Sequence, residues 1–439
     1  MSLIRYRPNL VRLFNDLKAL RVDPGSISRL VAIQESLIRE IVAAERRLRR
    51  HEQRLSQLKR LMTSRLGKAQ AAAVKRKVRA THELRTRDKC LMHVYRTIGD
   101  GLAFQYIPRW DIKPMAFKSP PGFVSGKAGA RRERDFLRRL SAHGHLSILT
   151  DLTNCLRYGD LIAMSKTAWV PIEVKSSHRR NQRAKRQMGT LDQLMEYIRN
   201  DKTDGWYRDN FPMQRVEAHS EVRDHIASLN GLLAGLNRQG LPFVFDEVEK
   251  GLYYFVGKTA QLSETTLPAL VMTAAKTPMI CILNEGKYST TGYFPLSLAI
   301  SEANDWFDFY EGDLIIAIVV DFDQVSQQLS GAGFEVELQE PDSDYTIILV
   351  RDEGTPNEML SGLSRHFWGR IWFEFVSLGW LLDEAINGTK VIEAMGAESE
   401  DSPNARGWPA KSGLAGAILR RKTKSPSRTS AAGVSTPVG

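Results

Sequence analysis

The chain has few cysteines and no long apolar run. Only three of its 439 residues are cysteine, Cys90, Cys155 and Cys281, and they lie far apart. Three scattered cysteines form neither a disulfide framework nor the paired spacing of a zinc site. No apolar stretch approaches the roughly 18 residues that a membrane-spanning helix needs. We therefore expect a soluble protein without a membrane span, in a reducing cytoplasm.

Other absences narrow the function. No glycine-rich phosphate loop is present, so ATP dependence is not expected. Residues 1–20 mix charged and apolar residues, which is unlike a signal peptide. No acidic residue follows Asp401, while Ser, Gly, Pro and Ala dominate residues 394–439. That composition predicts a disordered basic tail.

The net charge of +12 is concentrated in one segment. Residues 41–100 hold seventeen Lys or Arg and five Asp or Glu, an excess equal to the net charge of the whole chain. A concentrated basic segment indicates a polyanionic partner, most often nucleic acid. The alternative is the solvated face of a coiled coil, because Lys and Arg also favour helices.

Residues 30–62 carry a heptad pattern, with core positions separated by alternating steps of four and three. The pattern predicts a coiled-coil seam, in which the polar residues Gln34 and His51 are expected to set the register. A second basic helix follows Gly67 with a weaker seam at Thr81, Leu84, Asp88, Leu91, Tyr95 and Ile98. The two helices can form an antiparallel hairpin within the chain or a parallel homodimer, and the sequence leaves both open.

Residues 128–200 hold the candidate chemistry. Residues 161–164 and 168–174 are apolar runs typical of a strand hairpin. Glu173 and Lys175 are two apart, so on a strand they project from the same face. Asp160 lies thirteen residues before Glu173, which suffices to complete one strand, turn and return beside it. Two carboxylates with water are the usual way in which proteins hold Mg²⁺.

These residues resemble the PD-(D/E)XK phosphodiesterase superfamily, the restriction-endonuclease-like fold of metal-dependent nucleases. The resemblance implies that Asp160 and Glu173 bind Mg²⁺ or Mn²⁺ and that Lys175 positions or activates the attacking water. It also implies a further metal ligand, Glu133, on the preceding helix, and a catalytic Gln193 on the following one. One departure is the glycine at position 159, where the family usually has proline.

A cluster of cations follows the Glu-x-Lys motif. It supplies five positive charges within eight residues, on Arg179, Arg180, Arg183, Lys185 and Arg186. We expect these side chains to contact a phosphate backbone, together with Gln187 and Tyr197 on a helix over residues 184–198. One branch of the superfamily shows Gln-x-x-x-Tyr at the place of Gln193 and Tyr197. The alternative for Tyr197 is a half-buried packing residue.

The remaining chain predicts a second mixed unit. Strands are expected at residues 212–218, 252–256, 279–283, 314–320, 334–338 and 345–350, and helices at 221–236, 296–310 and 358–386. Residues 99–121, rich in aromatics and proline, are expected to form a linker packed on a neighbour. We therefore divide the chain into a helical arm (1–100), a packed linker (101–127), a nuclease core (128–225), a C-terminal α/β domain (226–393) and the tail (394–439).

Together these patterns predict an α/β (α+β) protein. A restriction-endonuclease-like core with a mixed sheet would follow a basic helical hairpin or coiled coil. The expected activity is metal-dependent hydrolysis of nucleic acid, with DNA ahead of RNA and endonuclease ahead of exonuclease action, in restriction, antiviral defence or repair. The alternative is a non-catalytic nucleic-acid-binding or scaffold protein. Further partners would be a second copy bound through the arm, or another protein bound through the C-terminal domain.

Overall fold

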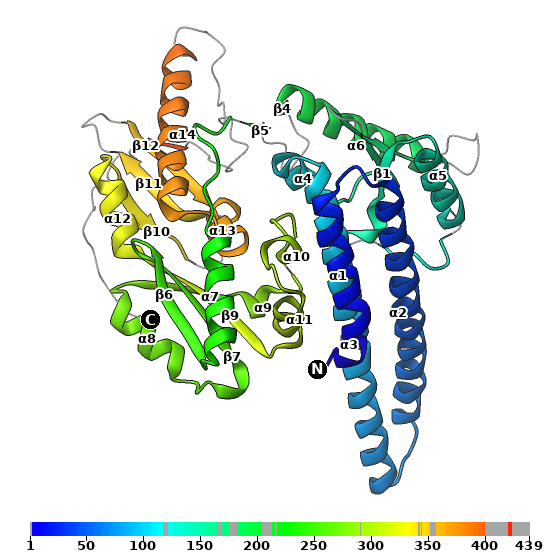
Figure 1. Ribbon diagram of the computed structural model, residues 1–439. Helices are drawn as coiled ribbons and strands as arrows, with labels where there is room; N and C mark the ends of the chain where they lie inside the picture. The colour runs from blue at the N-terminus through cyan, green and yellow to red at the C-terminus, as the bar shows by residue number, and fades with distance from the viewer. Residues whose placement is uncertain are drawn as a thin grey trace, which may run out of the picture.

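The computed structural model describes residues 2–116, 122–127, 129–164, 168–174, 182–203, 213–215, 217–289, 291–340, 343, 345–351, 357–399 and 420–423. The fold is mixed α/β, with long helices and small antiparallel sheets (Figure 1). Among the described residues, no helix combines the length and the apolar composition needed to cross a bilayer.

The N-terminal part is helical. Its elements are α1 (Arg7–Val22), α2 (Ile27–Met62), α3 (Lys68–Tyr106) and α4 (Arg109–Met115). The long helices α2 and α3 pack side by side as an antiparallel hairpin, with α1 lying along them (Figure 1). Within one chain, the hairpin arrangement is therefore the one observed.

The two polar residues of the predicted seam, Gln34 and His51, contact different parts of the structure. Asp88 of α3 is fully buried, 3.0 Å from Arg47 Nε and 3.2 Å from His51 Nε2 of α2, so these side chains couple the two helices. Gln34 instead hydrogen-bonds to a strand, since its amide donates to Ser147 O and accepts from Leu149 N, both at 2.9 Å. The expectation that Gln34 sets the hairpin register was wrong, because Gln34 satisfies the backbone of a neighbouring strand.

A helix, three strands and a second helix follow. They are α5 (Ala130–Ala142), β1 (Leu146–Leu149), β2 (Leu161–Met164), β3 (Trp169–Ile172) and α6 (Gln182–Asn200). The hairpin and both helices predicted from the sequence are confirmed. The strands form an antiparallel sheet in the order β1-β2-β3, while β4 (Lys202–Thr203) and β5 (Met213–Gln214) pair separately. The predicted mixed pairing is thus wrong for the described strands, because such short connections join only antiparallel neighbours.

The C-terminal part begins with α7 (Ile226–Gln239) and is organised around a sheet of order β6-β7-β9-β8. Its strands are β6 (Phe243–Glu249), β7 (Leu252–Lys258), β8 (Pro278–Ile282) and β9 (Leu314–Asp321). The intervening helices are α8 (Thr266–Ala274), α9 (Leu283–Gly286), α10 (Leu296–Ala299) and α11 (Ala303–Glu311).

A second sheet follows, of order β10-β11-β12-β13. The elements are α12 (Phe322–Gly331), β10 (Glu335–Leu338), β11 (Tyr345–Arg351), β12 (Asn357–Ser364), α13 (Arg365–Glu374), α14 (Leu378–Ser399) and β13 (Arg420–Thr423). The predicted helix over residues 358–386 is wrong at its start, where β12 pairs with β11 and Gly362 packs closely against the Tyr345 ring. Of the predicted tail, residues 400–419 and 424–439 lie outside the described residues.

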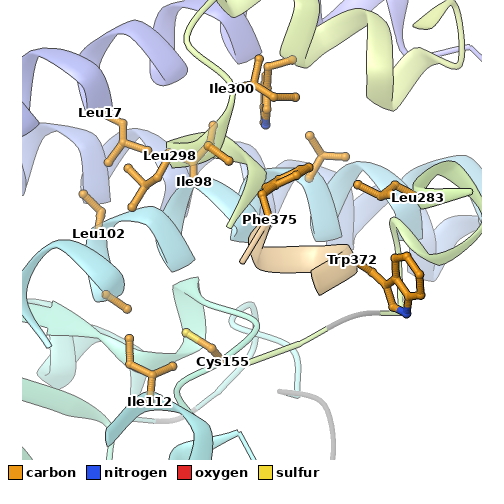
Figure 2. Close-up of a cluster of buried hydrophobic side chains, with 14 of the residues drawn as sticks. Leu17, Ile98, Leu102, Ile112, Cys155, Leu283, Leu298, Ile300, Trp372 and Phe375 are labelled. Atoms are coloured by element: carbon orange, nitrogen blue, oxygen red, sulfur yellow. The ribbon is translucent and has the colours of Figure 1, made fainter. Parts of the chain in front are cut away.

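One hydrophobic core joins the helical part to the C-terminal sheets. Leu17 of α1 and Ile98 of α3 lie beside Leu298 of α10, as Figure 2 shows, and all three side chains are buried. Near the same surface, α1 packs on α11, where the Phe14 and Trp306 rings lie 5.1 Å apart. The helices therefore share their apolar face with the C-terminal part.

Helix α3 runs seven residues past Gly99, where the sequence predicted a linker. The glycine marks a close approach, because a Cβ at Gly99 would lie 2.0 Å from the carbonyl oxygen of Leu152. At Gly101, a Cβ would lie 2.5 Å from a methyl of Leu17. The aromatic residues that suggested a linker, Phe104, Tyr106 and Trp110, belong instead to the end of α3 and to α4.

We predict that Gly99→Ala lowers the free energy of unfolding by about 1–3 kcal/mol, since a methyl group cannot fit beside a backbone carbonyl. Gly231→Ala is the matched control, because Gly231 also lies inside a helix but has nothing within 4 Å of the added Cβ. The control should raise the stability by about 0.5–1 kcal/mol. Urea unfolding measures both, and equal effects of the same sign would contradict this packing.

The carboxylate of Glu249 on β6 binds the start of α14. It accepts hydrogen bonds from Leu378 N and Gly379 N at 2.9 Å and from Ser377 Oγ at 3.0 Å, and His225 Nε2 lies 2.9 Å away. Burial opposes ionisation, but the hydrogen bonds outweigh it and lower the pKa of Glu249 from 4.5 to about 2. Glu249 therefore joins the first C-terminal sheet to α14.

A depressed carboxyl pKa contributes stability above the unfolded value of 4.5, and this contribution is lost as the pH falls towards 2. We expect Glu249→Gln to lower the free energy of unfolding by about 2–3 kcal/mol near neutral pH. The difference from the wild type should shrink as the pH falls below 4.5. Urea unfolding over this range measures it, with the exposed Asp246→Asn on the same strand as control; a difference independent of pH would refute the linkage.

Candidate functional site

The turn before β2 places Asp160 at the end of the three-stranded sheet. Gly159 has a φ of +75°, and a Cβ there would lie 3.2 Å from the Ile172 backbone. Proline, the usual family residue, cannot adopt this φ, so the structure explains the departure at this position. Continuing the β2–β3 register by one residue sets Asp160 opposite Glu173. In addition, Val174 N donates a 2.9 Å hydrogen bond to Asp160 Oδ2, so the predicted approach of Asp160 to the end of β3 is confirmed.

Three carboxylates converge on one ammonium group. Lys127 Nζ lies 3.0 Å from Glu133 Oε1, 3.0 Å from Asp151 Oδ2 and 3.0 Å from Asp160 Oδ1. Glu133 comes from the first turn of α5, Asp151 from the segment after β1, and Asp160 from the turn before β2. We call these four residues the carboxylate cluster.

Burial and charge shift the pKa values within the cluster. The Glu133 side chain is only 6% exposed. Burial raises the pKa of Glu133 to about 7, with the charges of Asp160 and Asp151 adding to the increase and Lys127 opposing it. Burial would lower the pKa of Lys127, but the attraction and hydrogen bond of Asp151, with those of its other acidic neighbours, raise it. The cluster therefore keeps one cation among its carboxylates near neutral pH.

Helix α2 fixes the loop that carries Lys127. The buried Glu45 carboxylate accepts hydrogen bonds from Val124 N at 2.8 Å and Ser125 N at 2.7 Å. Arg49 donates to Ser125 O, and Gly126 makes the turn with a φ of +79°. The basic helix thus has a structural task beside any electrostatic one.

Helix α3 fixes the segment that carries Asp151. The Asp100 carboxylate accepts from Asn154 N at 2.6 Å and Cys155 N at 2.9 Å, and burial raises its pKa despite these hydrogen bonds. Arg96 donates to Asp151 O at 3.2 Å and to Gly122 O at 3.4 Å. Arg96 therefore bridges the two segments that supply Lys127 and Asp151.

The other predicted site residues lie in different surroundings. Gln193 is exposed on α6. Tyr197 is buried, with the Arg215 guanidinium 5.2 Å from its ring centre, and burial raises its pKa to about 12. Arg215 in turn donates to Asp111 Oδ1 at 2.6 Å, so Tyr197 belongs to a packed contact between α6 and α4. Arg186 is exposed near the start of α6.

Several predicted residues cannot be placed. Lys175, Arg179 and Arg180 lie outside the described residues. The side chains of Arg183, Lys185 and Gln187, on the first part of α6, lie outside them as well. Their roles remain predictions.

The cluster offers suitable donors for a hard cation but not a finished site. In the part of the chain that the structure describes, no group of three or more His, Cys, Asp or Glu side chains is placed to hold a metal ion. Carboxylate oxygens bind Mg²⁺ at about 2.0–2.1 Å, whereas those of the cluster stand 3.0 Å from an ammonium nitrogen. A divalent cation in that place would require Lys127 to leave and each carboxylate to approach by about 1 Å.

Comparisons with protein-family models, with curated proteins and with solved structures return no match for this chain. The arrangement of the described residues therefore carries the functional argument.

Sequence reasoning did not find Lys127 or Asp151. Both lie in irregular segments, and neither belongs to the motif around Asp160 and Glu173. The only local signal for Asp151 is its place directly after a strand, near the sheet end where Asp160 also lies. Lys127 had no local signal, because α2 places its loop through long-range contacts.

We predict that Lys127→Met lowers the free energy of unfolding by about 2 kcal/mol in EDTA near neutral pH, because three carboxylates lose their partly buried counter-ion. Added Mg²⁺ or Mn²⁺ should restore part of the loss through binding to the folded state. The control is Lys59→Met, an exposed lysine in the last turn of α2. Urea unfolding with and without metal is the measurement, and a variant as stable as the wild type in EDTA would show that the cluster does not form.

Proposed function

We propose that this protein is a divalent-metal-dependent nuclease that hydrolyses phosphodiester bonds of nucleic acid, with DNA as the main substrate. The observation that carries the proposal is the convergence of the Glu133, Asp151 and Asp160 carboxylates at the sheet end, where the register also sets Glu173 opposite Asp160. Carboxylates gathered in this way are the ligands that Mg²⁺ and Mn²⁺ favour.

The order of elements supports the same proposal. A helix with an acidic residue, a strand hairpin ending in Glu173, and a following helix occur here as α5, β2–β3 and α6. The PD-(D/E)XK resemblance implies this order, and the restriction-endonuclease-like core is part of the proposal.

Each residue has a proposed task. Asp160 and Glu173 would hold the metal ion, with Glu133 and Asp151 beside them. A bound Mg²⁺ or Mn²⁺ would polarise the phosphate and lower the pKa of a water molecule. Lys175 would steady the attacking water or the developing negative charge, and Gln193 would orient Lys175 or the phosphate. Lys127 would offset part of the carboxylate charge when no metal is bound.

A second candidate is a nucleic-acid-binding protein without catalysis. The favouring observation is Lys127 itself, which occupies the centre of the carboxylates where a metal would lie. If Lys127 never leaves, the cluster is a structural ion network, and the basic helices provide the binding surface.

Cleavage assays separate the two candidates. We expect the wild type to cut circular as well as linear DNA in Mg²⁺ or Mn²⁺ and to be inactive in EDTA. Asp160→Asn and Glu173→Ala should each reduce cutting more than about 100-fold, because even the loss of a residue that only orients a metal ligand costs about 10–100-fold. Lys175→Ala should abolish cutting but leave DNA binding intact.

Asp246→Asn is the control, since Asp246 is exposed on β6 and belongs neither to the cluster nor to the groove beside it. It should cut at the wild-type rate. DNA binding without cutting in any metal would favour the non-catalytic candidate, and cutting that survives Glu173→Ala would refute the assigned site.

A further inference from the structure

A groove opens beside the carboxylate cluster. Helix α2 forms one wall, α5 forms the other, and residues 124–126 with the end of β1 complete it. Its volume is about 380 Å³, near the lower end of the range for small-ligand sites. Glu133 and Asp151 line the groove and also contact Lys127. The groove therefore leads directly to the proposed site of hydrolysis.

Arginines line both walls of the groove. Arg46 comes from α2, and Arg131, Arg134 and Arg138 come from α5 at spacings of three and four, which place them on one helix face. Arg138 is engaged, because its guanidinium binds Glu35 at 2.7 Å and approaches Asp135 at 3.8 Å. For Arg46, Arg131 and Arg134, no ion pair is recorded among the described residues.

Four arginines and three acidic residues line the groove. The acidic residues already contact cations, because Glu133 and Asp151 contact Lys127 and Asp135 approaches Arg138. Arg46, Arg131 and Arg134 lie on the walls, around an apolar floor that includes Ile38, Leu149 and Leu152. Guanidinium groups above an apolar floor suit a ligand with a phosphate chain and an organic body.

An exposed aromatic residue adjoins the groove in sequence. Phe123 directly precedes the lining residue Val124, and the residue is 40% exposed. The Arg49 guanidinium lies 4.8 Å from the centre of this ring. In single-stranded nucleic-acid sites, bases stack on aromatic rings and arginine adds cation–π contacts.

We propose that this groove binds a single nucleic-acid strand, with phosphates on Arg46, Arg131 and Arg134 and a base on Phe123, and leads it to the carboxylate cluster. The inference rests on the proposed function for its direction, but the binding itself does not require catalysis. The volume of about 380 Å³ suits a short segment of one strand.

The test is fluorescence anisotropy of a labelled single-stranded oligodeoxynucleotide in EDTA, over a series of salt concentrations. The double variant Arg46→Gln and Arg134→Gln should bind about tenfold more weakly. Its slope of log affinity against log salt should fall by about 0.7 for each phosphate that the variant no longer neutralises. Phe123→Ala should weaken binding about tenfold with the slope unchanged, because stacking releases no counter-ions.

The matched control is the double variant Arg50→Gln and Arg139→Gln. Both arginines are exposed on the same two helices, and neither lines the groove. The control removes the same charge and should keep the wild-type affinity. Equal weakening in both double variants, or displacement of the oligonucleotide by polyglutamate at matched charge, would overturn the proposal in favour of unspecific attraction.

Failures of the two proposals can be told apart. If the wild type cuts DNA but the groove variants bind the strand as well as the wild type does, the groove is wrong and the nuclease stands. If the wild type never cuts but the groove variants lose strand binding, the groove stands and the nuclease is wrong. The urea unfolding midpoint of each groove variant is also measured at increasing Mn²⁺ concentrations. Midpoints equal to those of the wild type would show that the fold and the cluster are intact in the variants.

Discussion

The candidate site depends on carboxylates that are buried on the helical hairpin and satisfied by backbone amides. An ionised carboxylate removed from water is costly unless hydrogen bonds replace its hydration. Glu45 meets this requirement with two amides of the loop before Lys127, and Asp100 meets it with two amides after Asp151. These helix side chains therefore determine where two irregular segments lie.

This arrangement gives the basic helices a second role. Residues 41–100 look from composition like an electrostatic arm, yet Glu45, Arg49 and Arg96 position the segments around the cluster. On the outer surface, Arg46 of the same helix faces the groove. The helix α2 thus directs the Glu45 carboxylate inward and the neighbouring Arg46 outward, as the helical period permits.

The carboxylate cluster depends on a single cation. Like charges held close together repel, and Lys127 offsets part of this repulsion through its contacts with all three carboxylates. The position of Lys127 depends in turn on α2, because Glu45 and Arg49 hold the loop that carries it.

The sequence alone determined the regular elements near the site. Short apolar runs predicted β2 and β3, the heptad pattern predicted α2, and the spacing of Asp160 and Glu173 predicted that they meet at a strand end. Those features depend on local periodicity, which can be read along the chain. The tertiary structure decided that Lys127 and Asp151 join Glu133 and Asp160, that Gln34 serves β1, and that α3 continues through Gly99. Each of these depends on contacts between residues far apart in sequence, which no local pattern specifies.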